Sequence, residues 1–98
     1  MSKKWSTEEL RAAVVAYKEM RSKELAGEPF VKSDYYRGLV SAHGRTEKAW
    51  GYRMSNISFV YDSMGLHYLK GLKPLSHVGA NVAHEIKELI NEKESNLF

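Results

Sequence analysis

The sequence predicts a mainly α-helical fold, a compact bundle of about four helices forming one domain over residues 1–98. Apolar residues recur at steps of three and four through most of the chain, which is the spacing of one face of a helix. The seven Gly and two Pro residues fall largely between these periodic segments. A chain of 98 residues, 43% of them hydrophobic, supports one hydrophobic core but not two.

The first helix is expected to begin after Ser6 and to end near residue 25. Ser6 as N-cap and Glu9 three residues later form a capping box, and Trp5 precedes them as a hydrophobic staple. Gly27 and Pro29 terminate the helix. Although an indole can stack on a base, the staple position favours a structural role for Trp5. The apolar stripe, interrupted by Arg21, comprises Leu10, Val14, Tyr17 and Leu25.

Two further helices are expected in the middle of the chain. A short one starts at about Lys32 or Ser33 and ends before Gly44. A longer one has Thr46 as N-cap and ends at Gly65 in a Schellman-type stop. The first carries the apolar residues Tyr35, Tyr36, Leu39 and Val40, and the second a regular stripe of Trp50, Met54, Ile57, Tyr61 and Met64.

A short extended loop or a small β-hairpin is expected before the last helix. Gly65, Gly71 and Pro74 punctuate this segment and disfavour helix there. The last helix begins around Ala80 or Asn81, with Val82, Ile86, Leu89 and Ile90 on its core face. The chain ends, about residues 1–4 and 92–98, are expected to fray.

Positive charge is concentrated in the middle of the chain. The net charge is +1 over residues 1–29, +4 over residues 30–77 and −2 over residues 78–98. A basic centre between a near-neutral and an acidic end indicates a surface that faces a polyanion. An uneven but solvated surface is the plainer interpretation.

Several classes of function lack their motifs in this sequence. There is no Cys, no Gly-rich phosphate loop and no pair of His residues at metal-ligand spacing on a helix. We therefore expect no metal, no cofactor and no catalysis by this chain. No signal peptide and no apolar run of membrane-spanning length is visible, which predicts a cytoplasmic protein without a membrane partner.

The candidate binding surface is centred on residues 45–77, where basic, aromatic and small polar residues alternate. Asn56 lies off the apolar stripe of the third helix. It can read a base edge or bind the backbone of the following loop, and the sequence leaves both open. The expected phosphate contacts are Arg37, Arg45, Lys48, Arg53, Lys70 and Lys73. The expected base contacts are Asn56 and Ser58, with Tyr52 or Tyr68 as stacking groups.

Several sequence segments occur in a familiar order: W-S-x-E-E-L, E-L-A-G-E-P-F-x-K, R-T, Y-R-M-S-N-I-S-F-V and G-L-x-Y-L-K-G-L-K-P. Over roughly residues 5–90 the chain resembles the N-terminal module of McrA-like modification-dependent HNH restriction endonucleases. The most specific parts are Asn56-Ile57-Ser58 and Gly71 to Pro74. The resemblance implies a module that binds double-stranded DNA ahead of a nuclease and, in some members, senses methylated cytosine.

The chain carries no H-N-H motif, so the implied role is non-catalytic, and cleavage would belong to a partner such as a separate nuclease subunit. The alternative is a small helical protein-interaction adaptor or inhibitor, for example phage-encoded, which uses the same surface. Tyr, Trp and Arg are enriched at protein interfaces as well, so composition does not separate the two.

Overall fold

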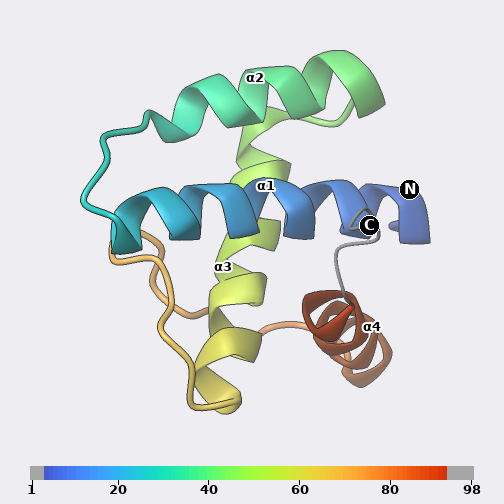
Figure 1. The fold of residues 1–98 in the computed structure, drawn as a ribbon. Coiled ribbons are helices and arrows are strands. Elements are labelled where there is room, and N and C mark those ends of the chain that lie inside the picture. The colour runs from blue at the N-terminus through green and yellow to red at the C-terminus, as the bar shows by residue number, and fades with distance from the viewer. Residues whose placement is uncertain (1–3, 93–98) are drawn as a thin grey trace.

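The computed structural model describes residues 4–92. This part of the chain contains helices α1 (Thr7–Leu25), α2 (Lys32–His43), α3 (Glu47–Ser63) and α4 (Ala80–Asn91). Figure 1 shows α1 and α2 running side by side in opposite directions, with α3 crossing behind α1 and α4 beside the lower half of α3. Both α1 and α3 pack against all three other helices. The predicted mainly α-helical bundle is confirmed.

Local side-chain caps determine the starts of α1 and α3. The Glu9 N–H donates to Ser6 Oγ at 3.0 Å, and the Ser6 N–H donates to Glu9 Oε1 at 2.9 Å, which is the predicted capping box of α1. At the start of α3 the Ala49 N–H donates to Thr46 Oγ1 at 3.0 Å. Both caps satisfy backbone N–H groups that have no partner inside the helix.

The core is shared by all four helices. The apolar stripes predicted for α1, α3 and α4 line it, together with Ala13 and Met20 of α1. Leu25 was wrongly placed on the buried stripe: it is 58% exposed, because the last turn of α1 projects past α3 (Figure 1). Arg21 covers the edge of the core, with Cζ 4.7 Å from the centre of the Tyr61 ring. The fully buried large side chains are Leu10, Tyr17, Met20, Trp50, Met54, Ile57, Leu69 and Ile86.

The segment between α3 and α4 is an extended loop. Gly65 ends α3 with φ at +75°, and the Leu66 N–H donates to the Tyr61 carbonyl at 3.0 Å, as a Schellman stop requires. No strand occurs within residues 4–92, so the hairpin form of the prediction is wrong and the loop form is right. Loop N–H groups bond to helices instead of to a second strand: Leu69 donates to the Tyr17 hydroxyl and Leu75 to the Ser55 carbonyl.

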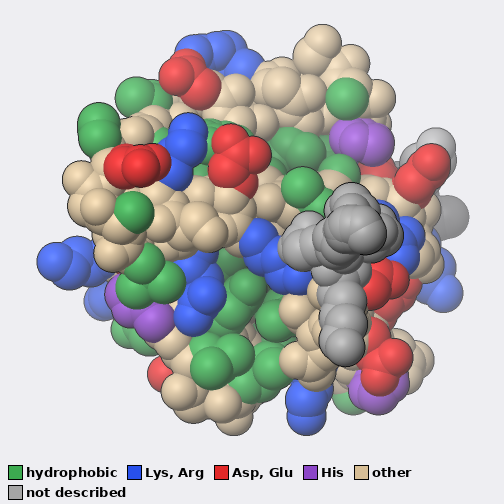
Figure 2. Space-filling view, in the orientation of Figure 1, with side chains coloured by type: hydrophobic (Ala, Val, Ile, Leu, Met, Phe, Trp, Pro, Cys, Tyr) green, Lys and Arg blue, Asp and Glu red, His purple; other side chains and the backbone are tan. Residues whose placement is uncertain are grey.

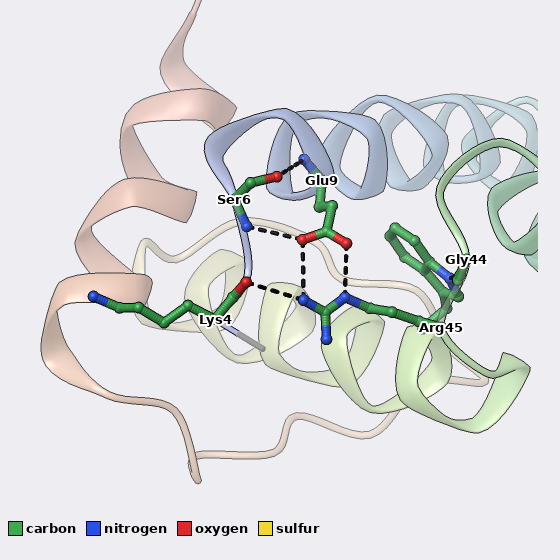
Figure 3. A network of polar contacts seen from close by, with 6 residues as sticks. Lys4, Ser6, Glu9, Gly44 and Arg45 are labelled. Atoms are coloured by element: carbon green, nitrogen blue, oxygen red, sulfur yellow. Dashed lines mark hydrogen bonds and ion pairs between the residues drawn. The ribbon is translucent and has the colours of Figure 1, made fainter. Parts of the chain in front are cut away.

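Arg45 joins the start of α1 to the start of α3 (Figure 3). Its Nε donates to Glu9 Oε2 at 2.7 Å, and its Nη2 donates to Glu9 Oε1 and to the Lys4 carbonyl at 3.0 Å each. The hydrogen bonds from Arg45 are the main reason why the pKa of Glu9 falls from its ordinary 4.5 to about 2. Nearby, Trp50 Nε1 donates to the Gly44 carbonyl at 2.9 Å, which ties the α2–α3 turn to α3.

The predicted fraying of the chain ends concerns mainly residues 1–3 and 93–98, which lie outside the described residues. Two end residues that are described make defined contacts. The Lys4 carbonyl accepts from Arg45, and Glu92 Oε2 lies 2.8 Å from Arg11 Nη2. In the part of the chain that the structure describes, no helix combines the length and the apolar composition needed to cross a membrane.

Candidate functional site

Two hollows lie next to each other where α3 meets the loop of residues 73–79. The lysine hollow, of about 590 Å³, is lined by Tyr36, Glu47, Lys48, Gly51, Tyr52, Ser55, Lys73, Pro74 and Leu75. The arginine hollow, of about 600 Å³, is lined by Trp5, Ala49, Tyr52, Arg53, Asn56, Leu75, His77, Val78, Gly79 and Val82. Because Tyr52 and Leu75 line both, the hollows are neighbours.

The sequence of α3 explains which side chains reach these hollows. Lys48 and Tyr52 are four residues apart and therefore share one face of the helix, while Arg53 and Asn56 share the adjoining face. The side chain of Tyr52 stands between the two hollows and is 55% exposed. One helix thus supplies a cation to each hollow and an aromatic ring to both.

Asn56 fastens the loop to α3. Its Nδ2 donates to the Leu75 carbonyl at 2.8 Å and, more weakly, to the His77 carbonyl at 3.4 Å. Its Oδ1 accepts from Arg53 Nη1 at 3.0 Å. The residue is 4% exposed. Of the two interpretations that the sequence allows for Asn56, the structure shows the loop-binding one, and the predicted base contact is not available to this side chain.

The lysine hollow combines two lysines and one acidic residue, Glu47, with an apolar wall. Lys48 and Lys73 are exposed, and among residues 4–92 no carboxylate forms an ion pair with either ammonium group. Tyr36, Pro74 and Leu75 supply apolar surface beside them. A ligand that carries both negative charge and a flat apolar group fits such a lining.

Arg53 is the central cation of the arginine hollow. Its Cζ lies 4.6 Å from the centre of the Trp5 ring, and its Nε is buried without a hydrogen-bond partner. No ion pair joins Arg53 to a carboxylate within residues 4–92. Burial, and secondarily the positive charge of Arg45, lower the pKa of this guanidinium. The site therefore holds a positive charge that is only partly compensated.

Three of the predicted site residues are engaged elsewhere in the protein. Arg37 lies on α2 and forms an ion pair with Asp34. Arg45 is held by Glu9, as described above. Ser58 has no exposed surface, and its Oγ lies 2.7 Å from the Tyr17 hydroxyl. The prediction that Ser58 contacts a base is wrong, because the residue belongs to the core.

Tyr68 and Lys70 lie on the loop but line neither of the two hollows. Tyr68 is half-buried and packs against the core. Lys70 is exposed, and its backbone N–H donates to the Glu24 carboxylate at 3.1 Å, which fixes the loop against the end of α1. Of these two side chains, the ammonium group of Lys70 is the one that is exposed to a ligand.

Sequence reasoning missed the residues that complete the hollows. Trp5 packs edge-on against Trp50, with ring centres 4.8 Å apart, and lies against both Arg45 and Arg53. Its position before the Ser6 cap indicated a structural role but not this contact. Leu75 is joined to α3 by its N–H hydrogen bond to the Ser55 carbonyl and by Asn56, and His77 is joined to α3 by Asn56. The one sequence signal for Leu75 was that an apolar residue follows Pro74.

A third hollow, of about 540 Å³, lies on another face of the molecule, between α1 and α2. Figure 2 shows hydrophobic side chains, with acidic ones among them, where these two helices meet. Val15 is 57% exposed there, and Glu8, Glu19 and Asp34 contribute negative charge. Arg11 is the one basic residue in the lining, so acidic residues outnumber basic ones there and the hollow disfavours a polyanion. Within residues 4–92, no group of three or more His, Asp or Glu residues is placed to hold a metal ion.

No protein-family model, curated protein or solved structure matches the chain.

Proposed function

We propose that the chain is a non-catalytic DNA-binding module that contacts a duplex through α3 and the loop of residues 70–79. The observation that carries this proposal is the lysine hollow, where Lys48 and Lys73 flank the exposed ring of Tyr52. Lysines bind phosphates, and an exposed aromatic ring gives a base a surface on which to stack.

How much each basic side chain contributes to DNA binding depends on whether it already forms an ion pair within the protein. Arg37 and Arg45 already bind carboxylates, so a phosphate would have to displace Asp34 or Glu9. The ammonium groups of Lys48, Lys70 and Lys73 have no such partner among the described residues. Three phosphate contacts from these lysines would give log K a slope of about −3 against log salt concentration, since each contact contributes roughly −0.9.

The finer part of the proposal is the sensing of modified cytosine. Tyr52 offers a stacking surface to a base that has left the duplex, and Pro74 and Leu75 offer apolar contact to a methyl group. Titration of methylated and unmethylated duplexes of one sequence tests this part separately. Any cleavage of the DNA would come from a separate nuclease subunit.

The test is fluorescence anisotropy of a labelled duplex between about 50 and 200 mM salt, a range over which phosphate-driven affinity changes strongly. Lys73→Met should weaken binding and make the slope of log K shallower by about 1. Lys87→Met is the matched control, because Lys87 is exposed on α4 and lines neither hollow. No binding of any duplex at the lowest salt would refute the proposal.

A second candidate is a protein-interaction adaptor or inhibitor that uses the same surface. The observation that favours it is the apolar wall of the lysine hollow, where Tyr36, Pro74 and Leu75 adjoin the exposed Tyr52. Aromatic and apolar residues at the centre, with charges at the rim, are typical of protein interfaces. An adaptor would bind its partner with little dependence on salt and would show no affinity for duplex DNA.

A further inference from the structure

We infer that the arginine hollow is a binding site for a phosphate group, held between Arg53 and the first turn of α4. The hollow is separate from the lysines that carry the proposed function. The inference rests on that function in one respect only, namely that the phosphate belongs to the backbone of a bound DNA strand. Phosphate binding itself can be tested without DNA.

Positive charge is in excess around Trp5, which favours the binding of an anion. Two guanidinium groups contact the Trp5 ring, with Arg45 Cζ at 4.2 Å and Arg53 Cζ at 4.6 Å from its centre. Glu9 neutralises Arg45 through two hydrogen bonds. None of the residues that line the arginine hollow is acidic. An anion in the hollow would relieve the repulsion between the two arginines and compensate the charge of Arg53.

Arg53 also has hydrogen-bonding capacity to spare. Its Nη1 donates to Asn56, whereas its Nε has no partner and is buried in the protein. A guanidinium carries several N–H donors in a rigid plane that matches the oxygens of a phosphate. The stacking on Trp5 and the bond to Asn56 hold this plane in place before any ligand arrives.

The start of α4 forms part of the lining of the hollow. Gly79 is the N-cap of this 12-residue helix and no side chain caps its first turn. Gly79 and Val82 line the hollow, and nothing lies within 4 Å of the point where a Cβ of residue 79 would stand. The N–H groups at a helix start have no partner inside the helix and favour negative charge.

One side chain positions both halves of the site. Asn56 holds Arg53 through Oδ1 and the backbone of Leu75 and His77 through Nδ2. The segment it holds leads directly into α4, so the guanidinium and the helix start are fixed relative to each other. His77 lines the same hollow, and an imidazole carries an N–H group that can donate to an anion.

The test is a titration with inorganic phosphate, followed by ¹H–¹⁵N correlation spectra at constant ionic strength set with chloride. We expect saturable shifts of the backbone amides of residues 79–82 and of the Arg53 Nε–H signal. Arg53→Met should weaken phosphate binding at least tenfold, and Arg53→Lys, which keeps the charge but loses the planar donors, should weaken it less. Arg37→Met, on α2, should leave it unchanged. Circular dichroism establishes that each variant is folded.

The outcomes separate the inference from the proposed function. The absence of saturable shifts, or equal shifts in wild type and Arg53→Met, overturns the phosphate site whatever DNA does. Duplex titrations then identify the source of the phosphate: a salt slope about 1 shallower in Arg53→Met supports a backbone phosphate. If the wild type binds inorganic phosphate but Arg53→Met has the same salt slope for duplex binding as the wild type, the site does not bind a DNA backbone phosphate. Failure of the wild type to bind any duplex refutes the proposed function alone.

Discussion

Arg45 and Glu9, 36 residues apart in the sequence, form a bidentate ion pair, with Nε–Oε2 at 2.7 Å and Nη2–Oε1 at 3.0 Å. Both side chains are 16% exposed. The same carboxylate accepts the Ser6 N–H of the α1 capping box. One Glu therefore completes a local cap and a long-range contact, and it also holds Arg45 against Trp5, beside the arginine hollow.

Glu9→Gln should destabilise the fold by about 2 kcal/mol at neutral pH, because hydrogen bonds to charged groups contribute about this much. The depressed pKa of Glu9, about 2 against an ordinary 4.5, fixes the pH dependence. Its stabilisation is complete above pH 4.5 and is lost as the pH falls through about 2. Urea unfolding of both proteins at pH 7 and pH 2 checks this. Equal stabilities at pH 7 would contradict it, and Glu8→Gln, in the same turn, is the control.

Asn56→Ala should destabilise the protein by about 1 to 3 kcal/mol, since it leaves the Leu75 carbonyl and Arg53 Nη1 without their partner. Hydrogen exchange should show faster opening of residues 73–79 than in the wild type. Asn91→Ala, at the exposed end of α4, is a matched control and should change neither quantity. Unchanged exchange in the loop would show that Asn56 does not hold it.

Tyr17→Phe should cost about 1 to 3 kcal/mol, because the Leu69 N–H and the Ser58 hydroxyl would be buried without their shared partner. Tyr35→Phe is the control: the Tyr35 hydroxyl donates to Glu19 in an exposed contact, and its loss should change stability by less than about 0.5 kcal/mol. Thermal unfolding measures both. Combining Tyr17→Phe with Ser58→Ala should cost less than the sum of the two changes, because both remove the same contact.

The helices could be predicted from the sequence because their signals are local. Ser6 with Glu9, Thr46 and Gly65 determine helix ends through contacts within a few residues. The side-chain period of three to four residues identified most of the buried faces. Leu25 shows where this reasoning fails: its register is right, but no other helix reaches the end of α1.

The candidate site was less predictable, because its polar residues depend on partners distant in the sequence. Arg45 and Arg53 look alike as basic residues near the start of α3, but Glu9 neutralises only the first. The sequence suggests that Ser58 and Asn56 are exposed polar residues. In the structure both are buried, because Ser58 contacts Tyr17 and Asn56 contacts the loop. Lys48, Tyr52 and Lys73 line one hollow in the structure, and the spacing of Lys48 and Tyr52 by one helical turn was the sequence signal for two of them.

Tyr52→Ser should weaken duplex binding about tenfold, in line with the roughly 1 to 3 kcal/mol that one stacked base contributes. Tyr52→Phe should bind as the wild type does, because it keeps the ring. Stability should change little, since Tyr52 is 55% exposed. Leu66→Ser is the control for a nonspecific effect of losing exposed apolar surface, because Leu66 is exposed and lines neither hollow. Equal affinities of Tyr52→Ser and wild type in anisotropy titrations would rule out stacking.

A ¹H–¹⁵N correlation spectrum of the protein, titrated with duplex DNA at low salt, identifies the residues that contact the duplex. The proposed function predicts shifts concentrated at residues 48–56 and 70–82, the two ranges that contain most of the residues lining the lysine and arginine hollows. It predicts none at the α1–α2 hollow around Val15. Shifts centred on α1 and α2, or no shifts at all, would contradict it.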